Sequence, residues 1–198
     1  MTSTKLAAVA VRAVLLAVCA ACAGAPPTPA APPGPDPLAS FATVAKVLQH
    51  PRCLSCHPAG DAPTQGDDVR PHSQEVVRGP EGRGVAGLAC ATCHGKANLP
   101  DSYGPGQPPG TPTEWKMPPP GNKMVFAGLT AKALCEQVKD PARNGGKTLP
   151  QLVEHATKDP IVLWGWKPGA GRTPVDTPHP VFAVAFAAWA TQGAPCPP

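Results

Sequence analysis

One five-residue pattern occurs twice in the sequence, and this repeat constrains the fold more than any other feature. Cys53-Leu54-Ser55-Cys56-His57 recurs as Cys90-Ala91-Thr92-Cys93-His94. Two cysteines separated by two residues and followed by histidine form the attachment motif of c-type haem. The thiols bond to two vinyl groups along one porphyrin edge, and the adjacent imidazole binds the iron. The sequence therefore predicts two haem c groups, attached through Cys53, Cys56, Cys90 and Cys93, with His57 and His94 as the proximal iron ligands.

The composition agrees with a fold that depends on bound cofactors. Among 198 residues there are 30 prolines and 20 glycines, but only four phenylalanines and one tyrosine. Such a chain offsets little of its conformational entropy by side-chain burial alone. Two porphyrins would supply the missing apolar core. We therefore expect a mainly α-helical protein with extensive irregular loops, folded as a single dihaem cytochrome c-like domain around the two haems.

The N-terminal segment has the features of an export signal. Lys5 and Arg12 precede a short apolar run that ends in small residues and is too short for a permanent membrane span. Cys19-Ala20-Ala21-Cys22 is also similar to a bacterial lipobox, in which Cys22 would carry the lipid. We expect a periplasmic protein of a Gram-negative-type bacterium, either soluble or lipid-anchored. The predicted organisation is a signal at residues 1–24, a Pro/Ala-rich linker at 25–37 and the dihaem domain at 38–198.

Two further cysteines, Cys135 and Cys196, remain in the mature part of the chain. The other six of the eight belong to the two motifs or to the signal region. Leftover thiols of an exported protein usually pair. The sequence therefore predicts a disulfide between Cys135 and Cys196 that joins the C-terminal tail to a helix at residues 129–139. Two buried free thiols are the alternative.

Four helices are expected from their start and stop signals. Asp36-Pro37 begins a helix that must end before Pro51, and Thr148-Leu149-Pro150-Gln151 is a capping box that opens a helix through Ala156. A third helix covers residues 129–139. The last begins at Thr177-Pro178 and ends at Gly193. No segment alternates convincingly as a strand.

The residue that binds each iron opposite its proximal histidine is less clearly indicated. The candidates are His50, His72, His155, His179, Met117 and Met124. His72 lies in a polar loop between the motifs and could reach either porphyrin. Met117, which precedes a proline, and Met124 lie in a Pro-rich loop after the second motif. We predict that His72 and one methionine are distal ligands, whereas His155, at the margin of an apolar stripe, is expected at a core boundary.

Paired CxxC elements have other uses. Four thiolates could bind zinc, two CxxC pairs could be redox-active on a thioredoxin-like fold, and each pair could close a structural disulfide. A zinc site leaves both histidines unexplained, and the βαβ pattern of a thioredoxin-like fold is not visible. Haem attachment is favoured because the export signal and both histidines agree with it.

Beyond the motifs, the chain resembles dihaem c-type cytochromes. The stretch from His50-Pro51-Arg52-Cys53 through Trp164-Gly165-Trp166 is similar to cytochrome subunits of isoquinoline 1-oxidoreductase-type molybdenum hydroxylases. More loosely, the close motifs resemble the small dihaem subunit of periplasmic nitrate reductase. This resemblance implies an electron-transfer protein that passes single electrons between a periplasmic oxidoreductase, such as a molybdenum hydroxylase, and a downstream acceptor.

A small haem enzyme or gas sensor with one open iron position is the alternative function. Peroxidase-like chemistry needs a distal acid–base set, and the sequence offers none that is convincing. The net charge is +4 without a dense basic run, so we expect no nucleic-acid partner and membrane contact only through an N-terminal lipid. Electron transfer is the favoured function.

Overall fold

The computed structural model describes residues 34–198. The predicted signal at residues 1–24, most of the predicted linker, and Cys22 with its proposed lipid lie outside the described residues. Within the described part of the chain, no helix is long and apolar enough to cross a membrane.

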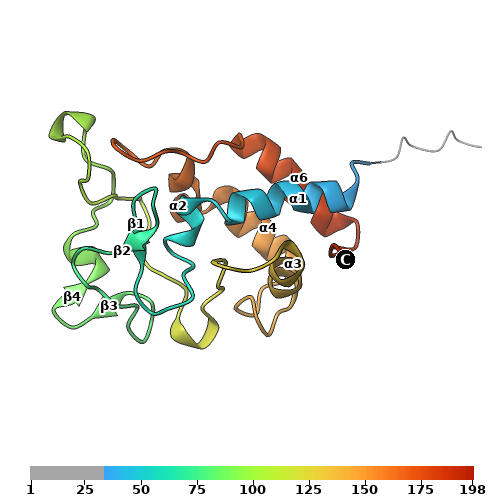
Figure 1. Ribbon diagram of the computed structural model, residues 1–198, viewed down its shortest axis with the longest axis horizontal. Coiled ribbons are helices and arrows are strands. Elements are labelled where there is room, and N and C mark those ends of the chain that lie inside the picture. The colour runs from blue at the N-terminus through green and yellow to red at the C-terminus, as the bar shows by residue number, and fades with distance from the viewer. Residues whose placement is uncertain (1–33) are drawn as a thin grey trace, which may run out of the picture. The chain divides into compact units, whose positions relative to one another are not determined.

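Four helices form one half of the described domain (Figure 1). α6 packs against both α1 and α4, and α1 also packs against α3. These helices confirm the predicted mainly helical fold with extensive loops. Their bounds are α1 Pro37–Leu48, α3 Ala131–Lys139, α4 Leu149–Lys158 and α6 His179–Thr191.

The helices α1, α3 and α4 begin where a polar side chain satisfies a free backbone N–H group, whereas α6 follows Pro178 without a side-chain cap. The Asp36 carboxylate accepts the N–H of Leu38 at 3.0 Å. Thr148 and Gln151 form the predicted capping box, each side chain accepting the other residue's N–H. Three bounds differ from the sequence expectation. α3 begins two residues later, after its cap Thr130, and α4 continues to Lys158. α6 begins one residue later, at His179, with Pro178 in the cap position.

Aromatic side chains fill the core between these helices. Phe41 of α1 and Trp189 of α6 are fully buried, and their ring centres lie 4.9 Å apart. Phe182 and Phe186 continue this contact along α6. Burying each such side chain stabilises the fold by about 1.5–3 kcal/mol. Leu38, in the first turn of α1, lies outside this core and is 42% exposed.

The other half consists of loops with short elements. Two hairpins lie in this half: Thr64 and Gln65 pair with Pro71 and Arg70, and Gly84 and Val85 pair with Ala89 and Leu88. Two-residue strands carry too little periodicity to be read from a sequence. The short elements are α2 Pro51–Leu54, β1 Thr64–Gln65, β2 Arg70–Pro71, β3 Gly84–Val85, β4 Leu88–Ala89, η1 Cys90–Thr92, η2 Asp101–Tyr103, η3 Pro120–Asn122, α5 Pro160–Leu163 and η4 Trp164–Trp166.

A disulfide between Cys135 and Cys196 confirms the predicted pair. It joins α3 to the C-terminal tail, which also accepts hydrogen bonds from Trp189 Nε1 at the Pro195 carbonyl (2.9 Å) and from Lys139 Nζ at the Ala194 carbonyl (3.2 Å). The tail is therefore held by the disulfide and by hydrogen bonds together.

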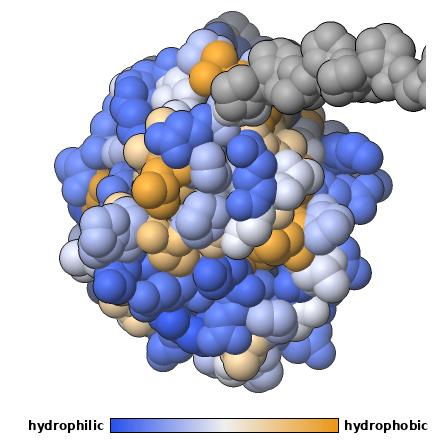
Figure 2. Space-filling view, turned by 90° about the vertical axis from the view of Figure 1, so that its right-hand side faces the viewer, coloured by the Kyte–Doolittle hydropathy of each residue, from blue (hydrophilic) through white to orange (hydrophobic). Residues whose placement is uncertain are grey.

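Figure 2 shows the face at the helical end, where hydrophobic residues occupy several small areas separated by hydrophilic ones.

Candidate haem sites

Two cavities contain the two motifs. The first cavity, of about 570 Å³, is lined by Cys53, Cys56 and His57 together with apolar side chains of α1, α3, α4 and α6. The second cavity, of about 610 Å³, is lined by Cys90, Cys93 and His94 and mostly by loop residues. Both volumes lie within the range of cofactor and ligand sites.

Each motif folds as a single helical turn. The His57 N–H donates to the Cys53 carbonyl at 3.1 Å, and the His94 N–H donates to the Cys90 carbonyl at 2.9 Å. In such a turn, residues three and four positions apart share one face. The spacing of the motif therefore places both thiols and the imidazole along one side of the turn, which is what attachment to a single porphyrin requires.

The imidazole of His57 is held in place by a hydrogen bond from its Nδ1 atom to a backbone carbonyl. This nitrogen lies 2.7 Å from the Met124 carbonyl oxygen, and because a carbonyl only accepts, Nδ1 carries the proton and Nε2 is left to bind a metal. The Phe126 ring stacks on His57 with ring centres 3.9 Å apart. Burial lowers the pKa of His57 to about 4, so the ring is neutral, as a metal ligand must be.

His94 has the same surroundings built from different residues. Its Nδ1 lies 2.8 Å from the Pro109 carbonyl, and Trp115 stacks on its ring with centres 4.7 Å apart. Burial lowers the pKa of His94 as well. Metal-binding histidines generally donate their second nitrogen to a carbonyl or carboxylate, which fixes the ring and its tautomer. Both motif histidines therefore have the surroundings that are typical of metal-binding histidines.

In comparisons with known proteins, no family model, no curated protein and no solved structure matches this chain. The assignment of the two cavities as candidate haem sites therefore rests on the residues that line them.

The four motif thiols do not fit the other uses of CxxC pairs. Within residues 34–198 all four are free, so neither motif is closed as a disulfide. Burial raises the pKa of Cys53 to about 12 and that of Cys56 to about 11, whereas redox-active CxxC pairs have lowered values. No three His, Cys, Asp or Glu side chains of the described residues lie close enough to hold one metal ion, which disfavours a tetrathiolate zinc site.

His72, the predicted distal ligand in the inter-motif loop, lies in the second cavity. Its ring centre is 6.2 Å from that of His94. Two imidazoles that bind one metal ion from opposite sides, each at about 2.0 Å, have ring centres about 6 Å apart. His72 Nδ1 accepts one long hydrogen bond, from the Gln74 backbone nitrogen at 3.4 Å. The two rings are thus spaced as a ligand pair.

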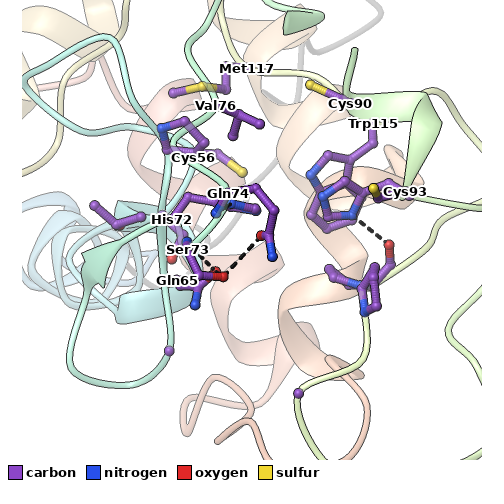
Figure 3. A pocket seen from close by; sticks show the side chains of 18 of the residues that line it. Cys56, Gln65, His72, Ser73, Gln74, Val76, Cys90, Cys93, Trp115 and Met117 are labelled. Carbon is purple, nitrogen blue, oxygen red and sulfur yellow. Dashed lines mark hydrogen bonds between the residues drawn. The ribbon is translucent and has the colours of Figure 1, made fainter. Parts of the chain in front are cut away.

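Figure 3 shows how the second cavity is enclosed. The side chains of Cys56, His72 and Met117 lie on one side, and those of Cys90, Cys93 and Trp115 lie on the other. A residue of the first motif thus helps to line the cavity of the second.

The two predicted methionines occupy different places. Met117 is buried and lines both cavities. Met124 lines the first cavity, in a left-handed backbone conformation (φ 47°) that presents its carbonyl to His57. His50 instead caps α2 by accepting the Arg52 N–H at 3.2 Å, and His179 packs against Trp166 with ring centres 4.7 Å apart. Neither of these two histidines lines a described cavity.

Four residues line both cavities and form what we call the shared wall: Arg52, Cys56, Met117 and Trp164. The buried Arg52 guanidinium donates to the Gly66 carbonyl at 2.7 Å and to Asp67 at 2.5 Å. Trp164 donates from Nε1 to Asn98 at 3.1 Å. The two sites are therefore adjacent.

Sequence reasoning missed several residues of the sites. Phe126 and Trp115 stack on the motif histidines, yet nothing in their local sequence distinguishes them from ordinary core residues. His155 was among the candidate ligands but was expected at a core boundary; it lines the first cavity, with its Nδ1 3.0 Å from an Asp159 carboxylate oxygen. The four-residue spacing between His155 and Asp159 is readable as a helical pair, and it is the signal that could have raised this histidine above the other candidates.

Proposed function

We propose that this protein is a periplasmic dihaem c-type cytochrome that passes single electrons between an oxidoreductase and a downstream acceptor. The observation that carries the proposal is that each cavity contains the same set of groups. Each has two free thiols and a neutral imidazole whose Nδ1 donates to a backbone carbonyl. These residues fit covalently bound haem, which would supply one-electron chemistry at its iron.

The protein residues would control where electrons can enter and leave. Cys53 and Cys56 are half-buried and face the first cavity, whereas Cys93 is exposed to solvent. The shared wall places the two sites side by side, which favours exchange of electrons between them. A partner would therefore dock near the second motif. The family resemblance proposes a periplasmic oxidoreductase of the molybdenum hydroxylase class as that partner.

A haem enzyme is the second candidate because of two polar residues on the second cavity. His72 and the buried Arg52 both line it, and such a pair could serve as an acid–base set at an open iron position. The spacing of His72 and His94 favours coordination by both rings, and this supports the electron carrier.

The proposal is tested on holoprotein expressed with its export signal in a host that matures c-type cytochromes. We expect two haems per chain, and a Soret band that stays with the chain after denaturation because the bonds are covalent. We also expect both irons to be six-coordinate and low-spin, without carbon monoxide binding. Absence of covalent haem would refute the cytochrome, and a high-spin iron that turns over peroxide would favour the enzyme.

Replacing His72 with alanine tests its part in the second site. We expect His72→Ala to keep two haems per chain but to convert one from low-spin to high-spin, since its iron loses a ligand. Electron paramagnetic resonance and carbon monoxide binding measure the conversion. Val77→Ala, an exposed change in the same loop at a residue that lines neither cavity, is the matched control. Unchanged low-spin spectra in His72→Ala would exclude this histidine.

A further inference from the structure

We infer that His155, positioned by Asp159, is the second protein ligand of the iron bound at the first motif. This assignment rests on the proposed function and adds to it. It differs from the sequence expectation that a methionine takes this place, and it would give both irons two histidine ligands.

The first argument is location. Among the described residues, His57 and His155 are the histidines that line the first cavity. They come from opposite parts of the chain: His57 follows α2, and His155 lies in α4. α4 is held in place by its capping box and by the buried side chains of Leu152 and Ala156. A ligand on a packed helix is fixed before any metal binds, which lowers the entropic cost of coordination.

The second argument is the state of the ring. His155 Nδ1 lies 3.0 Å from Asp159 Oδ2, and a carboxylate only accepts, so this nitrogen carries the proton. Asp159 is fixed in turn, because its Oδ1 accepts the Ile161 N–H at 3.0 Å and so caps α5. Nε2 of His155 is left as the atom that can bind iron. The arrangement matches that of His57, with a carboxylate in place of the carbonyl.

The third argument concerns the competing methionine. The Met124 carbonyl lies at Nδ1 of His57, behind the ring and away from the Nε2 that would face iron. The backbone of Met124 is therefore on the proximal side, whereas a sixth ligand must approach from the opposite side. Met117 lies in the shared wall and is held there by its N–H, which donates to the Gly82 carbonyl at 2.8 Å.

The assignment has an electronic consequence. Imidazole in place of methionine thioether lowers the reduction potential of a c-type haem. A carboxylate hydrogen-bonded to the ligand makes the imidazole a stronger donor and lowers the potential further. The iron at the first motif should therefore have the lower potential of the two, since His72 has no carboxylate partner among its hydrogen bonds.

The deciding experiment compares variants of the holoprotein by haem count, electron paramagnetic resonance, carbon monoxide binding and redox titration. We expect His155→Ala to retain two haems per chain and to lose about half of the low-spin signal, with added imidazole restoring it. His155→Met should keep both irons six-coordinate with one potential raised. Asp159→Asn should stay low-spin but also raise one potential, a change that a merely structural role would not produce.

Three controls separate the outcomes. Glu154→Ala changes an exposed residue of the same helix and should leave both signals unaltered. Met124→Leu and Met117→Leu test the rival ligands. Conversion of one iron to high spin in either methionine variant, with unchanged spectra in His155→Ala, would overturn the assignment and leave the cytochrome intact. A wild-type chain without covalent haem would instead refute the proposed function itself.

Discussion

Removing the attachment cysteines of the first motif should unfold most of the domain, whereas removing those of the second should not. The matched variants are Cys53→Ser with Cys56→Ser, and Cys90→Ser with Cys93→Ser. The difference arises because the first cavity is bounded by the helical core itself. Its lining includes Leu48, Val138, Leu152, Phe182 and Phe186. The second cavity is bounded mainly by loops.

The size of the first cavity sets the expected magnitude. A dry cavity in a core destabilises a protein by about 24 cal/mol per Å³. For the 570 Å³ of the first cavity, this rule gives about 14 kcal/mol if the walls do not move, which is near the upper end of the whole stability of a typical domain, about 5–15 kcal/mol. If the first cavity holds haem as proposed, we expect the core to collapse or open to water when that haem is absent.

Circular dichroism and thermal unfolding of the two double variants measure this difference. We expect the first-motif variant to lose most of its helical signal and its cooperative transition. The second-motif variant should keep the signal of α1, α3, α4 and α6 and one bound haem. A well-ordered first-motif variant without its haem would show that the helical half folds independently, and it would contradict the prediction.

Loss of the disulfide should lower thermal stability without altering the haem sites. Cys135 and Cys196 are 61 residues apart, and closing a loop of this length stabilises the folded state by about 4 kcal/mol in the chain-entropy model. For a domain of this size, that corresponds to a melting temperature about 8–16 °C lower. The test variant is Cys135→Ala with Cys196→Ala, followed by scanning calorimetry of the holoprotein.

The spectrum of the same variant provides the control. Neither cysteine is among the described residues that line a cavity, so the absorption and resonance spectra should match those of wild type. Reduction of the wild-type disulfide by a mild thiol should give the same loss in melting temperature, because the thioether bonds to haem are not reducible. An unchanged melting temperature would mean that the packing of Trp189 and the tail polar contacts hold this end alone.

Features encoded within a few residues could be predicted from the sequence. The caps at Asp36 and Thr148 fixed where α1 and α4 begin, and the motif spacing placed two thiols and a histidine on one helical turn at each motif. Counting the remaining cysteines identified the disulfide. Each of these depends on local hydrogen bonding or on a covalent requirement, and none of them needs knowledge of how distant segments pack.

The parts that escaped prediction are contacts between distant segments. The carbonyl that holds His57 comes from Met124, 67 residues away, and no local pattern connects them. His155 lies at the margin of the apolar stripe of its helix, a position that suits a residue at the core boundary as well as a residue that faces a ligand cavity. Only the folded chain shows that this stripe faces a cavity. The hairpins were missed because two-residue strands have no period to detect.

The burial of the first-motif thiols in their cavity has a consequence for how haem would be attached to this protein. Cys53 and Cys56 are half-buried, and burial raises their pKa values to about 12 and about 11, so little of either thiol is in the reactive thiolate form in the folded chain. We therefore expect haem to be joined faster while the chain is still extended. At that stage Cys135 and Cys196 are also unprotected in an oxidising compartment. During maturation, thioether formation between the motif cysteines and haem would therefore compete with disulfide formation between these cysteines and the other thiols of the chain.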